Sequence, residues 1–293
     1  MWINIIRVVI YITGGVLLLV CCLNLYNYIY KMQRPLQLKL MYFTAIAIIV
    51  MDMYGVSKIE AKTDFCSYGM IWALWGVRWL NIVLPLLQAS ILTMLYKQLN
   101  HLQYCSDTFS DSQINNNVIL FKKQQQYLRS RKTNLIVAVV LSLLCVAIYV
   151  IDSMIWLHIA NSEGLCHNAY AKVRELPDAR TYYISYLIVH TILGLCIITW
   201  LTIVTIGIAR ILNKISQDDF TLQKRRIQII LGSFVTSIIV WSILDAYTGV
   251  FGWTLYSDFT QIILTLMIQP AFGNFIPIAI LMYTHLSNVT SIQ

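Results

Sequence analysis

The stretch Ile71–Lys97, IWALWGVRWLNIVLPLLQASILTMLYK, is long and apolar enough to cross a lipid bilayer, yet it carries polar residues along its length. Arg78, Asn81, Pro85 and Gln88 recur at helical spacing, so they lie along one face of the predicted helix. An arginine inside such a helix costs at least about 2.5 kcal/mol unless it meets a partner or water. We therefore expect this face to look inward, toward other helices.

The composition of the whole chain indicates an integral membrane protein. Of its 293 residues, 58% are hydrophobic and 12% are charged, whereas a soluble globular protein carries about 25% charged residues. The net charge of +8 is not a nucleic-acid signal, because the basic residues stand in the links between hydrophobic runs.

Seven runs reach the length of about 20 apolar residues that a transmembrane helix needs. The first is interpreted as a retained helix, because it is longer than the apolar core of a signal peptide and has no small-residue cleavage site. The predicted fold is all-α, a polytopic bundle of seven transmembrane helices forming one domain over residues 1–293. These helices are expected at residues 5–30, 38–56, 71–96, 134–157, 182–211, 227–250 and 258–285.

The links between the runs differ in positive charge. Fourteen of the 21 Lys and Arg residues lie in or beside the first, third and fifth links, and seven lie on the other side. Cytoplasmic links carry the excess of positive charge. We therefore expect the N-terminus outside and the C-terminus inside.

The third link, residues 101–132, is the longest and has a polar first half and a basic second half. Two interpretations of the basic half stand: an extension of the fourth helix lying along the lipid headgroups, or a docking surface for a cytosolic protein. The residues just before the sixth run allow similar interpretations. The candidate cytoplasmic partner surface consists of Lys122, Lys123, Arg129, Lys224, Arg225 and Arg226.

Six of the seven predicted helices carry polar or charged residues in their outer halves. Asp52 and Arg78 lie at matching depth, roughly 10 Å below the outer surface at 1.5 Å per residue, and are natural partners. Such a pair either pins two helices together or forms the floor of a ligand cavity open to the outside. Each polar residue can also be a satisfied contact between helices. The candidate cavity residues are Asp52, Arg78, Asn81, Gln88, Asp152, His190, Asp245 and Gln261.

Two cysteines, Cys66 and Cys166, fall in outer links. Because that side of the membrane is oxidising, a disulfide between them is predicted, with two free thiols as the alternative. Four other cysteines lie inside predicted helices and are expected to behave as small apolar residues: Cys21, Cys22, Cys145 and Cys196.

The sequence shows no frame for catalysis. The five histidines form no H-x-x-x-H or H-E-x-x-H pair, as a zinc hydrolase requires, and there is no G-x-S-x-G nucleophile motif. The last run has no lysine for a retinal Schiff base, and no run has the regularly spaced arginines of a voltage sensor. We therefore expect no enzymatic activity, no cofactor and no bound metal.

Three segments resemble the tobamovirus-multiplication-protein family of heptahelical membrane proteins: KMQRPLQLKLMYFTAIAI at 31–48, LPLLQASILTMLYKQLNHL at 84–102 and NFIPIAILMYTHLS at 274–287. The chain departs from that family at two places. Residues 93–95 stand where a Trp-Ala-Glu-like triplet is usual, and Asp52 lies in the helix where the family usually has an arginine. The resemblance implies a receptor-like seven-helix fold that scaffolds cytosolic partners. It also implies the plasma membrane or an endomembrane, such as that of the vacuole or lysosome.

The predicted plan is also similar to that of G-protein-coupled receptors, although the class A motifs are missing: no proline follows Trp241, and Asn274 and Pro277 are not adjacent. The leading hypothesis is a receptor-like or scaffolding protein with an outer ligand cavity and a cytosolic protein partner in addition to the lipid bilayer. A structural subunit of a larger membrane complex is the alternative. A transporter or channel is disfavoured, since the inner halves of the third, fifth and sixth runs offer only Ser and Thr.

Overall fold

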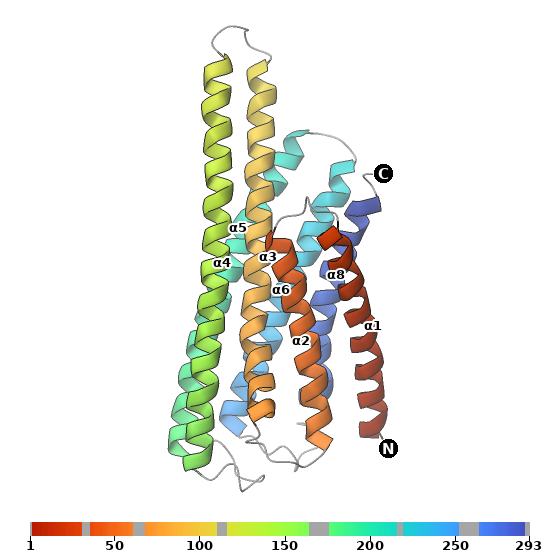
Figure 1. Ribbon diagram of the computed structural model, residues 1–293, viewed down its shortest axis with the longest axis vertical. Helices are drawn as coiled ribbons and strands as arrows, with labels where there is room; N and C mark the ends of the chain where they lie inside the picture. Colours follow the sequence, from red (N-terminus) through yellow and green to blue (C-terminus); the bar gives the residue numbers. More distant parts are fainter. Residues whose placement is uncertain are drawn as a thin grey trace.

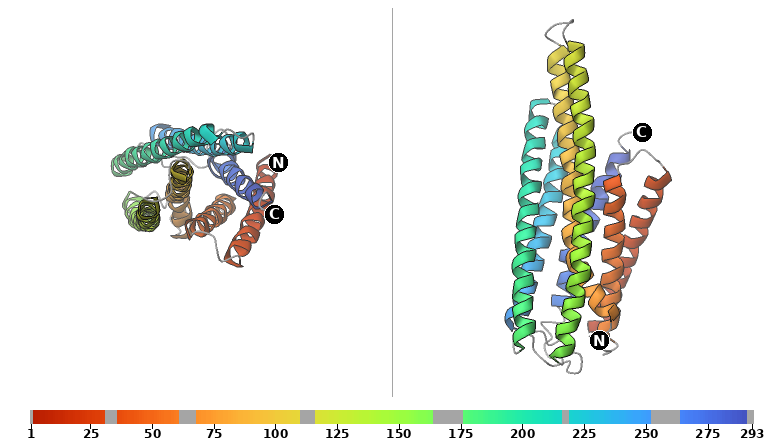
Figure 2. Two further views of the ribbon diagram at one scale, coloured as in Figure 1. Left: turned by 90° about the horizontal axis from the view of Figure 1, so that it is seen from above. Right: turned by 60° about the vertical axis from the view of Figure 1, so that its left-hand side comes forward.

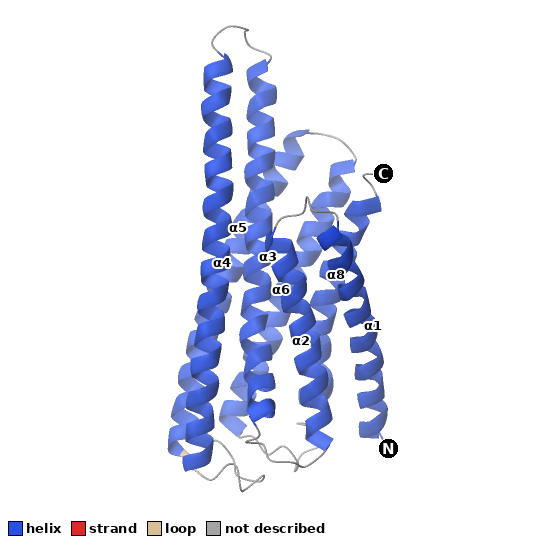
Figure 3. Cartoon of the chain, viewed as in Figure 1, coloured by secondary structure: helices blue, strands red, loops and turns tan. Residues whose placement is uncertain are grey.

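The computed structural model describes residues 2–30, 36–60, 68–109, 116–163, 176–215, 219–251 and 264–290. The elements within these ranges are all helices (Figure 3), so the all-α prediction is confirmed for this part of the chain. In chain order they are α1 (Trp2–Tyr30), α2 (Leu36–Glu60), α3 (Tyr68–Phe109), α4 (Asn116–Ser162), α5 (Pro177–Ile215), α6 (Asp219–Phe251), the π-helix η2 (Leu264–Phe275) and α8 (Ile276–Thr290).

The helices from α1 to α6 are long and apolar enough to cross a membrane. The run expected at 258–285 corresponds to η2 and α8, which follow each other directly and have 12 and 15 residues. Several helices extend well beyond the predicted runs, because hydrogen bonding continues past the point where the apolar residues end. The membrane-length segments are Arg7–Asn27, Leu36–Ser57, Trp75–His101, Leu128–Ser162, Pro177–Asn213 and Arg225–Leu244.

The central element of the bundle is α3, which contacts α2, α4, α5 and α6 (Figure 2). Every residue from Asn81 to Ser90 is buried. A helix with neighbours on several sides buries polar side chains together with apolar ones, and these polar groups must then find partners within the protein. The inward direction predicted for the polar face of Ile71–Lys97 is confirmed, since Arg78, Asn81 and Gln88 are all buried.

The N-terminus of α1 and the C-terminus of α8 lie at opposite ends of the bundle, called here the N-terminal end and the C-terminal end (Figure 1). At the C-terminal end, α3 and α4 run side by side beyond the other helices (Figures 1 and 2). We call this projection, residues 102–109 and 116–127, the arm. It contains Lys122 and Lys123.

The arm corrects one interpretation of the third link. An extension of the fourth helix is present, but it continues along the helix axis, beside α3, and is not turned onto a headgroup surface. Polar contacts between the two helices at the base of the arm account for this direction. Lys97 Nζ donates a hydrogen bond to Ser130 Oγ at 2.5 Å, and Asn134 Nδ2 donates to the Ser90 carbonyl oxygen at 2.9 Å.

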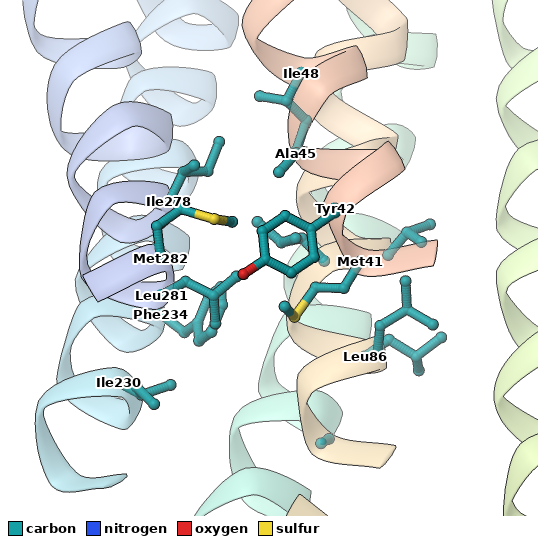
Figure 4. Packing of buried hydrophobic residues seen from close by; sticks show 14 of the residues in the cluster. Met41, Tyr42, Ala45, Ile48, Leu86, Ile230, Phe234, Ile278, Leu281 and Met282 are labelled. Atoms are coloured by element: carbon teal, nitrogen blue, oxygen red, sulfur yellow. The ribbon is translucent and has the colours of Figure 1, made fainter. Parts of the chain in front are cut away.

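Apolar packing falls into two clusters. The larger one joins α1, α2, α3, α5, α6, η2 and α8. Figure 4 shows the Tyr42 ring reaching from α2 toward Phe234 of α6 and toward Leu281 and Met282 of α8. The smaller cluster is aromatic, joins α3, α4 and α5, and is described below with the polar residues that it surrounds.

The predicted disulfide and one cavity candidate lie outside the described residues: Cys66, Cys166 and Gln261. The four cysteines expected inside helices are free thiols within α1, α4 and α5. Of these, Cys21 is buried and Cys145 half-buried, while Cys22 and Cys196 are exposed on the outer surface of their helices.

Candidate functional site

Arg78 is buried in a cage of aromatic rings. Its guanidinium carbon lies 4.9 Å from the ring centre of Trp75, 5.4 Å from that of Tyr183 and 5.7 Å from that of Tyr186. Its Nη2 donates a hydrogen bond of 2.7 Å to the Tyr183 hydroxyl. Aromatic faces attract a cation most strongly where water is excluded, so the cage offsets part of the cost of burying this charge.

Asp152 of α4 stands beside this cage. Its carboxylate accepts hydrogen bonds from Trp79 Nε1, at 2.9 Å, and from the Tyr182 hydroxyl. The positive charge of Arg78 also acts on this carboxylate. The aromatic cluster thus contains opposite charges from α3 and α4, with α5 supplying the tyrosines.

His190 of α5 completes the aromatic cluster. The side chain is 1% exposed, and its Nε2 lies 3.3 Å from the carbonyl oxygen of Arg78. Because a carbonyl oxygen can only accept, this contact places the proton on Nε2. The ring lies 5.3 Å from that of Tyr186 and 6.3 Å from that of Trp79. His190 therefore ties α5 to the backbone of α3 next to the caged arginine.

A second polar cluster is centred on Asn274, near the end of η2. Asn274 Nδ2 donates to the carboxylate of Asp52 on α2. Its Oδ1 accepts from Asn81 Nδ2 of α3 at 2.6 Å and from Trp241 Nε1 of α6 at 3.2 Å. One buried amide therefore connects η2 with three other helices.

The backbone around Asn274 is π-helical, from Leu264 to Phe275, and includes Pro270. Ser237 Oγ of α6 donates a 2.5 Å hydrogen bond to the carbonyl oxygen of Gly273. π-helical turns are rare and occur frequently at functional sites. The Asn274 cluster therefore coincides with the irregular backbone of the last helical segment.

The expected pairing of Asp52 with Arg78 is not the arrangement found. Both side chains are buried, as predicted, but each has different partners: Asp52 accepts from Asn274, whereas Arg78 donates to Tyr183 and is influenced by Asp152. Matching depth along two neighbouring helices does not fix the direction in which each side chain points around its helix axis. Asp52 points toward η2 and Arg78 toward α4 and α5.

The other predicted site residues are distributed as follows. Asn81, Asp152 and His190 belong to the two clusters. Gln88 is buried on α3, and its Oε1 has no hydrogen-bond partner within the described part of the chain. Asp245 and Lys224 lie within α6. Of the remaining basic candidates, Arg129 and Arg225 are exposed and Arg226 is half-buried.

Several residues of both clusters were not predicted from the sequence. The aromatic cage had a readable signal, since Trp72, Trp75 and Trp79 repeat at the spacing of one helix face. The same spacing relates Tyr183 and Tyr186. Asn274 is an amide inside the apolar last run, between two prolines, and its position there was the available signal.

Comparison with known proteins gives no match for this chain, whether with protein-family models, curated proteins or solved structures. Within the described residues, no group of three or more His, Cys, Asp or Glu side chains could hold a metal ion. The two buried polar clusters and the charged surface are the features of the described chain that bear on its function.

A close helix contact beside Asn274 leads to a first prediction. We expect Gly273→Ala to lower the free energy of unfolding by about 1–3 kcal/mol. A Cβ atom at this position would lie 2.8 Å from Trp241 Nε1, and the indole cannot retreat without losing its hydrogen bond to Asn274. The measurement is unfolding by sodium dodecyl sulfate in mixed micelles, followed by far-ultraviolet circular dichroism.

Gly232→Ala is the matched control, because a Cβ atom at Gly232 of α6 would meet nothing within 4 Å. It should leave stability unchanged or raise it by up to about 1 kcal/mol, because alanine is the better helix former. Equal stability of both variants would show that η2 does not require the close approach to Trp241.

Proposed function

We propose that the chain is a receptor-like or scaffolding membrane protein of seven spans. In this proposal η2 and α8 form the seventh span, the N-terminal end of the bundle faces outward, and the C-terminal end faces the cytosol. The unequal distribution of basic residues supports the orientation. The proposal includes the Cys66–Cys166 disulfide on the outer side.

The observation that carries the proposal is the convergence of buried polar side chains in the half of the bundle nearer the N-terminal end. Asp52, Asn81 and Trp241 meet at Asn274, and Arg78 meets α4 and α5 in the neighbouring cluster. Buried polar groups inside a membrane are costly, and their occurrence there is by default a sign of function. A ligand that enters from the outside would reach these clusters first.

The packing of the other half favours a receptor or scaffold over a transporter or channel. Toward the C-terminal end the space between α2, α6 and α8 is filled by large apolar side chains, among them Phe234, Leu281 and Met282 (Figure 4). A transport path needs polar or hydrated groups that continue to the other side. The described part of this half buries amide and hydroxyl side chains, among them Gln37, Gln88 and Ser233, but no charged one.

The arm supports an interaction with a cytosolic protein. It projects beyond the membrane-length segments of α3 and α4 and carries Lys122 and Lys123. The resemblance to the tobamovirus-multiplication-protein family favours scaffolding of the same kind. We assign the chain no catalytic step.

Purification of the full chain from its native membrane in a mild detergent tests the proposal. We expect a cytosolic protein to co-purify, and to be lost or depleted at least about five-fold in the variant Lys122→Glu/Lys123→Glu, because charge reversal at a docking surface is costly. Arg180→Glu, at the opposite end of the bundle, is the control and should retain the partner.

The identity of the co-purifying protein separates the alternatives. A heterotrimeric G protein would favour a receptor, and another soluble protein a scaffold. A stoichiometric set of membrane subunits, retained by the Lys122→Glu/Lys123→Glu variant, would contradict the proposal and favour a structural subunit of a larger complex.

A further inference from the structure

Exposed basic side chains stand at the C-terminal end of three different helices. Arg129 and Lys132 are exposed on α4, Arg210 on α5 and Arg225 on α6. Among the side chains that the structure describes, no acidic one is exposed at this end. The exposed charged side chains that the structure describes at this end are therefore all basic.

On α6, Arg225 continues a stripe of exposed apolar residues. Ile229, Ile239 and Ile243 are 45%, 51% and 61% exposed. They lie on the same side of the helix as Arg225, because their separations from it are close to whole turns of about 3.6 residues. Ile243 is about 27 Å from Arg225 along the axis at 1.5 Å per residue, close to the roughly 30 Å thickness of the hydrocarbon layer.

The same pattern occurs on α5 and α4. Arg210 continues a stripe on α5 whose exposed apolar members include Ile192, Ile203 and Ile206. On α4, Arg129 and Lys132 both precede a similar stripe of exposed apolar residues. The members of this stripe include Ile136, Val140, Leu143, Ile151 and Met154.

We infer that Arg129, Lys132, Arg210 and Arg225 form a binding surface for the headgroups of anionic phospholipids in the leaflet at the C-terminal end. Acyl chains cover the apolar stripes, and each stripe leads directly to a cation at the depth of the phosphate. Long basic side chains reach from apolar surface to the headgroup layer. The arginine guanidinium can also bind phosphate through two hydrogen bonds.

This inference goes beyond the proposed function and does not depend on a ligand inside the bundle. It assigns Arg129 and Arg225 to the lipid and leaves Lys122 and Lys123 of the arm for a protein. The two assignments are separable, because the arm lies beyond the membrane-length segment of α4, which begins at Leu128.

Among the described residues, the opposite end of the bundle exposes an acidic side chain as well as a basic one, and it supplies the control. Asp178 and Arg180 are both exposed at the start of α5. Their charges cancel, and the backbone N–H groups of Asp178 and Ala179 donate to the carboxylate of Glu163 at 3.0 Å. We expect no preference for anionic lipid at this end.

Electron paramagnetic resonance of spin-labelled lipids tests the inference with the full chain in phosphatidylcholine vesicles. The measured quantity is the association of spin-labelled phosphatidylserine relative to spin-labelled phosphatidylcholine. We expect a preference of about three-fold for phosphatidylserine, falling toward about one-fold in the variant Arg129→Gln/Lys132→Gln/Arg210→Gln/Arg225→Gln. Arg180→Gln should keep the wild-type preference.

Two additional measurements keep the test decisive. High salt should reduce the preference of the wild-type protein, because it screens exposed charges. This measurement needs no variant, so it remains informative if the quadruple variant does not fold. Soluble glycerophosphoserine should not displace the labelled lipid, since it lacks acyl chains for the stripes. A wild-type preference near one-fold, a salt-independent preference, or an equal loss in Arg180→Gln would overturn the inference.

Discussion

Replacing Asn274 by leucine should lower the free energy of unfolding by about 2–4 kcal/mol, because three hydrogen bonds at roughly 0.6 kcal/mol each are lost and buried polar groups remain unsatisfied. The affected groups are the Asp52 carboxylate, Asn81 Nδ2 and Trp241 Nε1. Leucine has nearly the same shape as asparagine, so the change tests the amide rather than the packing. Unfolding by sodium dodecyl sulfate in mixed micelles, followed by circular dichroism, measures the loss.

Tyr283→Phe is the matched control, since Tyr283 lies on α8 and is 69% exposed. It should change stability by less than about 0.5 kcal/mol. The double variant Asp52→Leu/Asn274→Leu should lose less stability than the sum of the two single variants, because either change alone removes the hydrogen bond between these two side chains. Additive losses would contradict the assigned contact between Asp52 and Asn274.

Replacing Arg78 by methionine should destabilise the protein by about 3 kcal/mol, since the change removes three aromatic contacts and leaves a carboxylate without its neighbouring cation. The carboxylate is that of Asp152, and the lost hydrogen bond is the one to Tyr183. Arg78→Lys should cost about 1–2 kcal/mol, because lysine keeps the charge but not the planar set of donors. The same unfolding assay compares both variants with wild type.

The exposed arginine of the same end, Arg180, supplies the control for this series. Arg180→Met should change stability by no more than about 0.5 kcal/mol. The double variant Arg78→Met/Asp152→Asn should recover part of the loss of Arg78→Met, because it removes the unbalanced negative charge. Absence of any recovery would show that Asp152 is not the charge partner of Arg78.

Apolar run length was sufficient to predict the six membrane-length helices α1 to α6, but not how their polar residues pair. The inward direction of Arg78 follows from the cost of an arginine in lipid, which depends only on the residue and its surroundings. The identity of its partner does not follow from depth, because two residues at the same depth can point in different directions around their helix axes. Asp52 and Arg78 share a depth and still belong to different clusters.

The last helical segment shows a second limit of sequence reasoning. Residues 258–285 predict a regular helix, because an apolar run of this length is assigned the α-helical period of about 3.6 residues. The π-helical turns of Leu264–Phe275 have a wider period, and it changes which residues face the bundle. Asn274 therefore lies at the centre of a cluster, although it was not among the site residues predicted from the sequence.

The arm and the aromatic cluster share the same two helices. Arg78 and Asp152 stand on the two helices that continue without interruption into the arm. The 47-residue α4 is about 70 Å long at 1.5 Å per residue, and most of that length lies on the far side of Asp152. A tilt of about 5° at Asp152 would therefore displace the tip by about 5 Å. The paired helices would act as a lever that converts a small rearrangement around the caged arginine into a movement large enough for a bound protein to sense.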